Sequence, residues 1–288
     1  MKKLSAFALL SACCAANAQT PADEPMPDGS RDMYVGLGLQ SRPRYSGAPM
    51  RVTRLVPAWQ AQWSNGIFVS GMDAGMHLSS TQGIEYGPLL ALQARRDEGG
   101  LRTGAVGTDG SWGMIGGASA GTGSGTVKIL TANKLAGMEP IHTRLLGGAF
   151  FNYYVAPEWR LTSSALWGAG NSRHGGMAEI GVQRLATAIA AHHTLSFAAG
   201  ATVVNRDYNQ AFFGVSVRDV VSSGNRYYQP GGGLKDVHVG VRWTWSLSPS
   251  WIVTSNLQAV RLLNDAANSP LVTRPTNLTA TAALAYRF

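Results

Sequence analysis

The chain has 288 residues, of which 14% are charged and 45% hydrophobic, and its formal net charge is +8. Average soluble domains carry about 25% charged residues and about 7% glycine, whereas this chain contains 35 glycines. The composition is too apolar for a disordered chain and too poor in Glu and Lys for a coiled coil. Beyond the N-terminus, no apolar run in the sequence is long enough for a transmembrane helix. These properties favour an all-β protein, either soluble or in an outer membrane.

The first 18 residues have the composition of a secretory signal peptide. Two lysines at positions 2 and 3 are followed by a short apolar core and by an Ala-x-Ala cleavage site at residues 16–18. Removal of residues 1–18 would lower the net charge to +6, because two lysines leave with them. Residues 19–32, rich in proline and acid, are predicted to form a flexible periplasmic leader. The folded domain is expected over residues 33–288.

Both cysteines of the chain, Cys13 and Cys14, lie within this N-terminal segment. Cleavage after Ala18 would therefore exclude disulfides, thiolate zinc sites and cysteine catalysis in the mature chain. The string Leu-Ser-Ala-Cys over residues 10–13 also resembles a bacterial lipobox, which would instead leave a lipidated Cys13 at the mature N-terminus. Both outcomes stay open at this stage.

The rest of the chain consists largely of segments that alternate apolar and polar residues with period two. In the clearest one, 237–247, valine, tryptophan and leucine occupy one face, whereas His238 and Arg242 lie on the other. Alternation of this kind indicates strands with unlike faces. Twelve such strands are predicted, at 33–42, 51–63, 66–75, 84–95, 101–108, 142–155, 158–168, 177–188, 193–205, 237–247, 251–262 and 278–288.

The lengths of these segments favour a membrane barrel. Most have 10–14 residues, whereas strands in globular proteins usually have about 5–6 and membrane-crossing strands about 9–11. Aromatic residues near the strand ends are typical of an interfacial girdle. The last strand ends in Tyr286 and Phe288, which resembles the signal read by the outer-membrane assembly machinery. A soluble β-sandwich would explain the alternation too, but not these lengths.

We therefore predict a transmembrane antiparallel β-barrel of about 12 strands, embedded in outer-membrane lipid, with short periplasmic turns and long outer loops. The periplasmic turns are expected at 64–66, 96–100, 156–157, 190–192 and 248–250. The outer loops are expected near 43–50, 76–83, 109–141, 169–176, 206–234 and 263–277. Residues 212–217 are placed inside the fifth of these loops, which is aromatic enough to fold inward and block the lumen.

Two stretches of the sequence are similar to the MipA/OmpV family of MltA-interacting proteins. Residues 208–215 resemble its Y-x-x-x-[YF]-F-G-V stretch and residues 261–271 its R-L-x-x-D-A-x-x-S-P-[IL] signature. The matching residues are Tyr208, Phe213, Gly214, Val215, Arg261, Leu262, Asp265, Ala266, Ser269 and Pro270. The resemblance implies a barrel in the cell outer membrane. For one founding member it also implies scaffolding between a murein lytic transglycosylase and a peptidoglycan synthase, and it supplies no catalytic residues.

Sites of chemistry are weakly indicated. The glycine-rich 121–125 stretch has no following Gly-Lys-Ser/Thr and so does not match a phosphate loop. Adjacent histidines on a strand point to opposite faces, so the pair at 192–193 does not predict a metal site. A hydrolase would need a nucleophile, a base and an orienting group in contact, and the available candidates are scattered: His142, His174 and His238 with Ser172, Asp219 or Asp236. No catalytic residue, cofactor, metal or nucleic-acid partner is predicted.

Polar residues on the strands suggest the character of the lumen. His238, Arg242 and Arg287 are expected to project inward, together with Arg261. Their charge would bias a pore toward anions, although they could equally be paired and structural. Asp265, Ser269 and Pro270 suit a turn that fixes the last outer loop. Three functions follow: a non-enzymatic scaffold, which we favour, a channel for small solutes or anions, and a barrel hydrolase.

Overall fold

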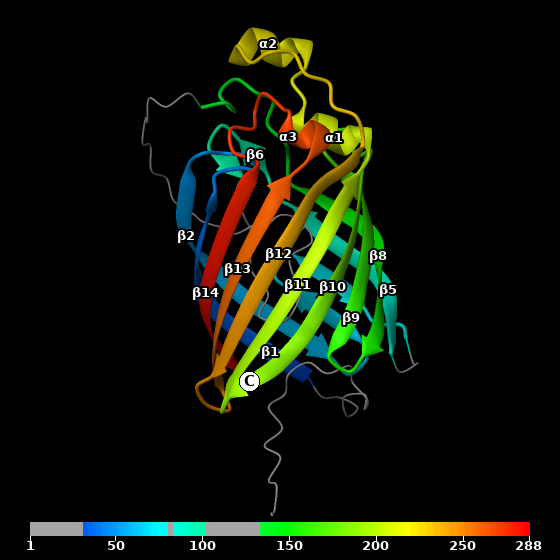
Figure 1. Ribbon diagram of the computed structural model, residues 1–288, viewed down its shortest axis with the longest axis vertical. Helices are drawn as coiled ribbons and strands as arrows, with labels where there is room; N and C mark the ends of the chain where they lie inside the picture. Colours follow the sequence, from blue (N-terminus) through cyan, green and yellow to red (C-terminus); the bar gives the residue numbers. More distant parts are fainter. Residues whose placement is uncertain (1–30, 80–82, 102–132) are drawn as a thin grey trace, which may run out of the picture.

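The computed structural model describes residues 31–79, 83–101 and 133–288 (Figure 1). In this part of the chain, twelve antiparallel strands close into one barrel. The barrel strands are β1 (Arg31–Pro43), β2 (Arg51–Trp63), β3 (Ile67–Ser70), β4 (Asp73–Met76), β5 (Ile84–Gln93), β8 (Arg144–Ala156), β9 (Trp159–Ala169), β10 (Gly175–Ala190), β11 (His193–Val204), β12 (Gly233–Ser246), β13 (Trp251–Leu262) and β14 (Thr276–Arg287). The other elements are β6 (Arg96–Asp97), β7 (Gly100–Leu101), α1 (Arg206–Phe213), α2 (Val217–Ser223) and α3 (Asn264–Ala267). The predicted fold class is thus confirmed.

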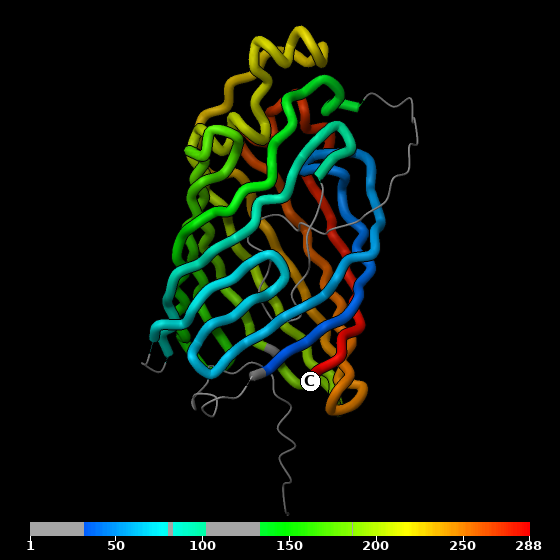
Figure 2. Tube along the Cα trace, turned by 180° about the vertical axis from the view of Figure 1, so that it is seen from behind, coloured from blue at the N-terminus to red at the C-terminus, as the bar shows by residue number. Residues whose placement is uncertain are grey.

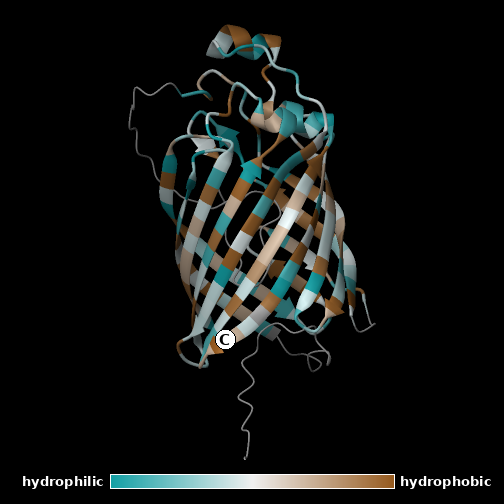
Figure 3. Ribbon diagram, viewed as in Figure 1, coloured by the Kyte–Doolittle hydropathy of each residue, from teal (hydrophilic) through white to brown (hydrophobic). Residues whose placement is uncertain are grey.

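Exposure alternates along the strands, as a wall between lipid and lumen requires. Leu37 and Leu55 are 65% and 67% exposed, whereas Gln40 and Val56 are buried. Figure 3 shows this alternation as brown and teal bands along the strands. Successive side chains on a strand point to opposite faces. The period-two pattern of the sequence therefore decides which residues face outward.

The first and last strands close the barrel. β1 pairs with β14 from Tyr34↔Arg287 to Ser41↔Ala280, and with β2 along its whole length. Closure removes the free edges that an open sheet would present to lipid, where an unpaired backbone group is costly. None of the helices in the described residues has the length and hydrophobicity of a membrane span.

The connections differ between the two ends of the barrel. Residues 157–158, 191–192 and 247–250 form short turns at the end where the chain terminates (Figure 1). The opposite end carries the three helices, in the connections 205–232 and 263–275. Outer-membrane barrels have short periplasmic turns and long extracellular loops. We therefore call the first end periplasmic and the second outer.

The predicted strand 66–75 is wrong in one respect, because the chain reverses within it. β3 and β4 form a short hairpin around Gly71, whose φ of 58° lies in the left-handed region that favours glycine. Figure 2 shows this hairpin, in cyan, ending well short of the outer end of its neighbours. As a result, residues 77–79 and Gly83 lie at the periplasmic end. The connection near 76–83 is therefore not an outer loop.

The predicted turn at 96–100 is at the other end of the barrel from the one expected. β6 and β7 pair as a small hairpin outside the barrel sheet, and β5 pairs directly with β8 over Ile84–Gln93. β5 rises to the outer end, so the hairpin that follows it also lies there. The predicted strand 101–108 lies outside the described residues from position 102 onward. The count of twelve strands is right, but β3 and β4 take the places of 66–75 and 101–108.

Candidate functional site

Three connections meet at the outer end and form what we call the outer cap: the β6–β7 hairpin, residues 205–232 and residues 263–275. Residues 212–217, predicted as part of a loop, contribute the end of helix α1. This helix is capped at its start by Asn205, whose side chain accepts a hydrogen bond from the Tyr208 N–H at 2.9 Å. Such an N-cap satisfies one of the donors that a helix start leaves free. Helix α2 is capped at its start by Ser216, through a full capping box with Asp219, and at its end by Gly224.

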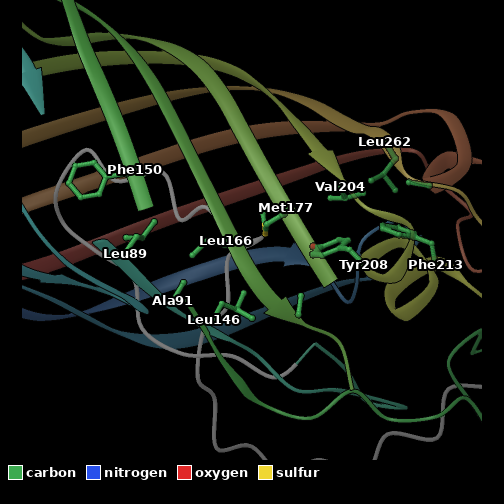
Figure 4. Close-up of a cluster of buried hydrophobic side chains, with 12 residues drawn as sticks. Leu89, Ala91, Leu146, Phe150, Leu166, Met177, Val204, Tyr208, Phe213 and Leu262 are labelled. Atoms are coloured by element: carbon green, nitrogen blue, oxygen red, sulfur yellow. The ribbon is translucent and has the colours of Figure 1, made fainter. Parts of the chain in front are cut away.

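The inner face of α1 packs into the outer part of the barrel. Tyr208 and Phe213 are buried in one cluster with Leu146 and Met177 of the wall. Figure 4 shows these side chains converging from the strands and the helix. The Tyr208 and Phe212 rings stack at 4.6 Å between centroids. Apolar burial on this scale stabilises the cap against the barrel mouth.

The two motif stretches of the sequence meet in this cap. Ser269 donates a buried hydrogen bond of 2.6 Å from Oγ to the Phe213 carbonyl, which joins residues 56 positions apart. Leu262 and Ala266 belong to the same apolar cluster as Phe213. Val215 and Leu271 are buried together in a second cluster at the outer end. The motif residues therefore hold the outer cap together.

Asp265 and Gly214 have structural roles in the same contacts. The Asp265 carboxylate accepts a hydrogen bond from the Gly231 N–H at 2.6 Å, and the Asp265 carbonyl accepts one from Tyr228 Oη at 2.8 Å. At Gly214, a Cβ atom would lie 2.5 Å from the Gln210 carbonyl oxygen, so a side chain there would disrupt the end of α1. Pro270 occupies the turn that follows α3.

Arg96, which the sequence analysis did not single out, holds the C-terminal end of α1. Its Nη1 donates to the Phe212 carbonyl at 2.5 Å and its Nη2 to the Ala211 carbonyl at 3.3 Å. Burial lowers the pKa of Arg96 to about 10, so the group is still charged at neutral pH. A cation at this helix end is favourable because it meets exposed carbonyl groups. No local pattern marks this residue, since its partner lies 116 positions away.

Asp219 fixes α2 in the cap. Its carboxylate accepts hydrogen bonds from Ser216 Oγ at 2.7 Å, from the Ser216 N–H at 3.1 Å and from the Glu139 N–H at 2.9 Å. Burial alone would raise the pKa of Asp219, but these hydrogen bonds outweigh it and lower the pKa below its usual range. The carboxylate thus links α2 to the chain segment that precedes β8.

Below the cap, His238 faces the lumen between two carboxylates. Its ring nitrogens lie 3.3 Å from Glu179 Oε1 and 3.3 Å from Asp236 Oδ1. Lys235 reaches Asp236 at 2.9 Å, because a bulge opposite Thr202 and Val203 leaves Lys235 without a register partner and turns its side chain toward Asp236. Sequence reasoning named His238 and Asp236 but missed Glu179 and Lys235.

This lumen cluster does not have the geometry of a hydrolase triad. Thr202 Oγ1 donates to Asp236 at 3.0 Å, and within the described residues the His238 ring contacts the carboxylates of Asp236 and Glu179 and no hydroxyl that it could deprotonate. The remaining candidates, His142, His174 and Ser172, lie in the outer loops away from this cluster. In residues 31–79, 83–101 and 133–288, no group of acidic or histidine side chains is arranged to hold a metal ion.

A second lumen network lies nearer the periplasmic end and was also absent from the sequence analysis. Glu85 accepts hydrogen bonds from Asn152 at 3.0 Å and from the Tyr154 hydroxyl at 2.6 Å. Arg160 forms an ion pair with Glu85 at 3.3 Å and donates to Gln183 at 3.0 Å. The network joins β5, β8, β9 and β10. Because Arg160 and Glu85 neutralise each other, neither presents a free charge to a solute in the lumen.

The arginines expected in the lumen are divided between the two faces. Arg242 is buried on the inward face of β12. Arg287 lies on the inward face at the periplasmic mouth, where its Nε is 2.7 Å from Asp32 Oδ1. Arg261 was expected inward, which is wrong: it is exposed on the outward face of β13, opposite Val237. The period-two register of β13 requires this, because Arg261 shares its parity with the exposed Leu257.

The C-terminal aromatics lie at the periplasmic end of the outward face. Tyr286 and Phe288 are 41% and 57% exposed, with their ring centroids 6.2 Å apart. Trp251 stands 5.1 Å from Tyr286, and the Trp243 and Trp245 rings stack on the neighbouring strand. Aromatic rings at this level are typical of a membrane interface.

The closed barrel, its outward apolar band and its aromatic girdle define an outer-membrane β-barrel. Within that class, the chain belongs to the MltA-interacting protein MipA family, whose model matches residues 35–288. The resemblance drawn from the two motifs and the outer-membrane location it implied are thereby confirmed. No curated protein matches the sequence.

Several solved outer-membrane barrels are similar in outline. The NanC porin is 8% identical with a TM-score of 0.40, over 90% of this chain and 100% of that one. An outer-membrane channel from Pseudomonas putida F1 is 9% identical with a TM-score of 0.41, over 93% and 99%. The Pseudomonas putida toluene transporter TodX is 8% identical with a TM-score of 0.36, over 93% and 92%.

Proposed function

We propose that this chain is a non-enzymatic barrel that binds murein-synthesising and murein-degrading enzymes at its periplasmic end, and so acts as a scaffold. The family match carries the proposal, since its description is that of an MltA-interacting protein. A murein enzyme in the periplasm meets the short turns at 157–158, 191–192 and 247–250. We propose that the leader predicted at 19–32 extends this small surface.

The geometry of the outer end supports a role other than transport. The outer cap packs α1 into the barrel mouth through Tyr208 and Phe213 and is fixed by Arg96 and Ser269. In the described residues, no hydroxyl is hydrogen-bonded to His238, since Thr202 donates to Asp236 instead, and this argues against a hydrolase function. A scaffold needs a stable barrel and an accessible periplasmic face, and both are compatible with this arrangement.

Capture from envelope extracts tests the scaffold. The full-length protein, purified from outer membranes, should recover a lytic transglycosylase and a peptidoglycan synthase. Deletion of residues 19–30, which leaves β1 and its Asp32–Arg287 ion pair in place, should weaken this recovery. Replacement of the same residues by a Gly/Ser segment of equal length should show whether sequence or only reach is required. Removal of α2 at the outer end is the matched control and should change nothing. Equal recovery with all variants, or no recovery of murein enzymes, would contradict the proposal.

An anion channel is the second candidate, favoured by the arginines on the inward face of the wall. Arg42, Arg54, Arg144 and Arg242 all have the parity of lumen-facing residues, whereas Arg160 on the same face is paired with Glu85. Planar-bilayer recording separates the two functions. The intact barrel should pass little current, and deletion of residues 209–230 should increase it. A large, steady, anion-selective conductance of the intact protein would favour the channel.

A further inference from the structure

Two arginines, Arg51 and Arg261, lie on the outward face of the barrel at its outer end, and a third, Arg274, lies in the connection that leads into β14. Arg261 lies directly opposite Thr276, and Arg274 precedes Thr276 by two residues. The Arg51 guanidinium donates to the Leu278 carbonyl at 2.6 Å and to the Ser41 carbonyl at 2.9 Å. Arg51, Arg261 and Arg274 are all exposed; we call them the rim arginines.

The rim arginines stand where the apolar outer surface ends. Toward the middle of the barrel, the outward face continues with Leu278 on β14 and, beyond Ala259, with Leu257 on β13, which are 44% and 48% exposed. Leu39 and Leu55 continue this apolar surface on β1 and β2, at 52% and 67%. Exposed leucines at this density are suited to lipid chains. The guanidinium groups therefore lie at the level of the outer-leaflet headgroups.

The charge of the rim arginines is not neutralised within the described residues. Some arginines at other places on the wall pair with carboxylates, as Arg160 does with Glu85 and Arg184 with Glu158. No ion pair of the described chain includes Arg51, Arg261 or Arg274. Three unneutralised guanidinium groups beside one strand end create a local positive potential. Such a potential attracts an anion located at the same depth.

We propose that the rim arginines form a binding site for the phosphate groups of lipopolysaccharide in the outer leaflet. The lipid A headgroup carries phosphates next to its acyl chains. This arrangement matches the outer end of the barrel, where the guanidinium groups lie on the outer side of the exposed leucines. Arginine binds phosphate through paired N–H donors with a geometry that lysine lacks. At the periplasmic end, the same strands carry Trp251 and Tyr286 in place of arginine, so the site is specific to one leaflet.

Binding to lipid A in nanodiscs tests this site with the full-length barrel. The double variant Arg261→Gln/Arg274→Gln should bind bisphosphorylated lipid A about 30-fold more weakly, from ~1 kcal/mol for each basic group at a membrane surface. Arg51 is left in place because it also bonds the backbone of β1 and β14. The control is Arg218→Gln/Arg226→Gln, which removes two exposed arginines from the α2 region and should bind normally. Heat-modifiable migration verifies that each variant is folded.

Three further arms identify the ligand and the chemistry. Dephosphorylated lipid A should bind the native protein as weakly as phosphorylated lipid A binds the double variant. Free inorganic phosphate should not compete at millimolar concentration if the acyl chains contribute. The variant Arg261→Lys/Arg274→Lys should recover part of the affinity. Equal affinity for the two forms of lipid A, or equal loss in the α2 control, would overturn the proposal.

Discussion

Replacing Arg96 with methionine should loosen the end of α1 and with it the outer cap. Methionine keeps much of the apolar volume but removes the charged donors to the Phe212 and Ala211 carbonyls. A hydrogen bond from a charged donor contributes about 1.5–3 kcal/mol, and a cation at a helix C-terminus about 0.3–1 kcal/mol. The guanidinium regains hydration when the cap opens, which offsets part of this sum. The net loss should be about 2 kcal/mol.

Hydrogen exchange of the α1 amides measures this loss directly. A change of ~2 kcal/mol in the free energy of local opening corresponds to about 30-fold faster exchange over residues 206–215. The matched control is Arg95→Met, since Arg95 is half exposed and pairs with Asp97 only at 3.5 Å. Exposed pairs contribute about 0–1 kcal/mol, so exchange in α1 should be nearly unchanged. Unaltered exchange in the Arg96 variant would refute the role assigned to this residue.

Three other changes have defined outcomes. Hydrogen bonds lower the pKa of Asp219 despite its burial. Its contribution to the stability of α2 is therefore complete above the ordinary carboxyl pKa and is lost as pH falls through the lowered one. The protection of the 216–224 amides, relative to their intrinsic exchange rate at each pH, should fall at acid pH in the native protein, and this pH dependence should be absent in Asp219→Asn. Ser269→Ala leaves the buried Phe213 carbonyl without its hydrogen-bond donor, which should destabilise this part of the cap by about 1–3 kcal/mol. Amide exchange over 212–215 should then be faster, and unchanged exchange would mean that a water replaces the hydroxyl. Phe288→Asp puts a charge in the exposed aromatic girdle and should reduce the heat-modifiable fraction in outer membranes without reducing export; normal insertion would contradict it.

The sequence by itself determined the wall of the barrel. The predicted strands 51–63 and 251–262 coincide with β2 and β13. In 237–247, the period-two pattern correctly separated exposed residues such as Val239 from buried ones such as Arg242. This succeeds because alternation is local: each strand carries its own lipid face and lumen face, whatever strand it pairs with. The sequence alone also identified Phe213 and Ser269, because both belong to short motifs shared with the family.

Only the tertiary structure decided how these parts meet. A continuous alternation over 66–75 did not reveal the reversal at Gly71, since a turn of two residues hardly interrupts the pattern. That reversal moved the following connections to the opposite end and brought Arg96 to the end of α1. The bond from Ser269 to Phe213 and the contact of His238 with Glu179 join residues more than fifty positions apart. Such contacts depend on barrel closure and on which strands become neighbours, and local periodicity carries no information about either.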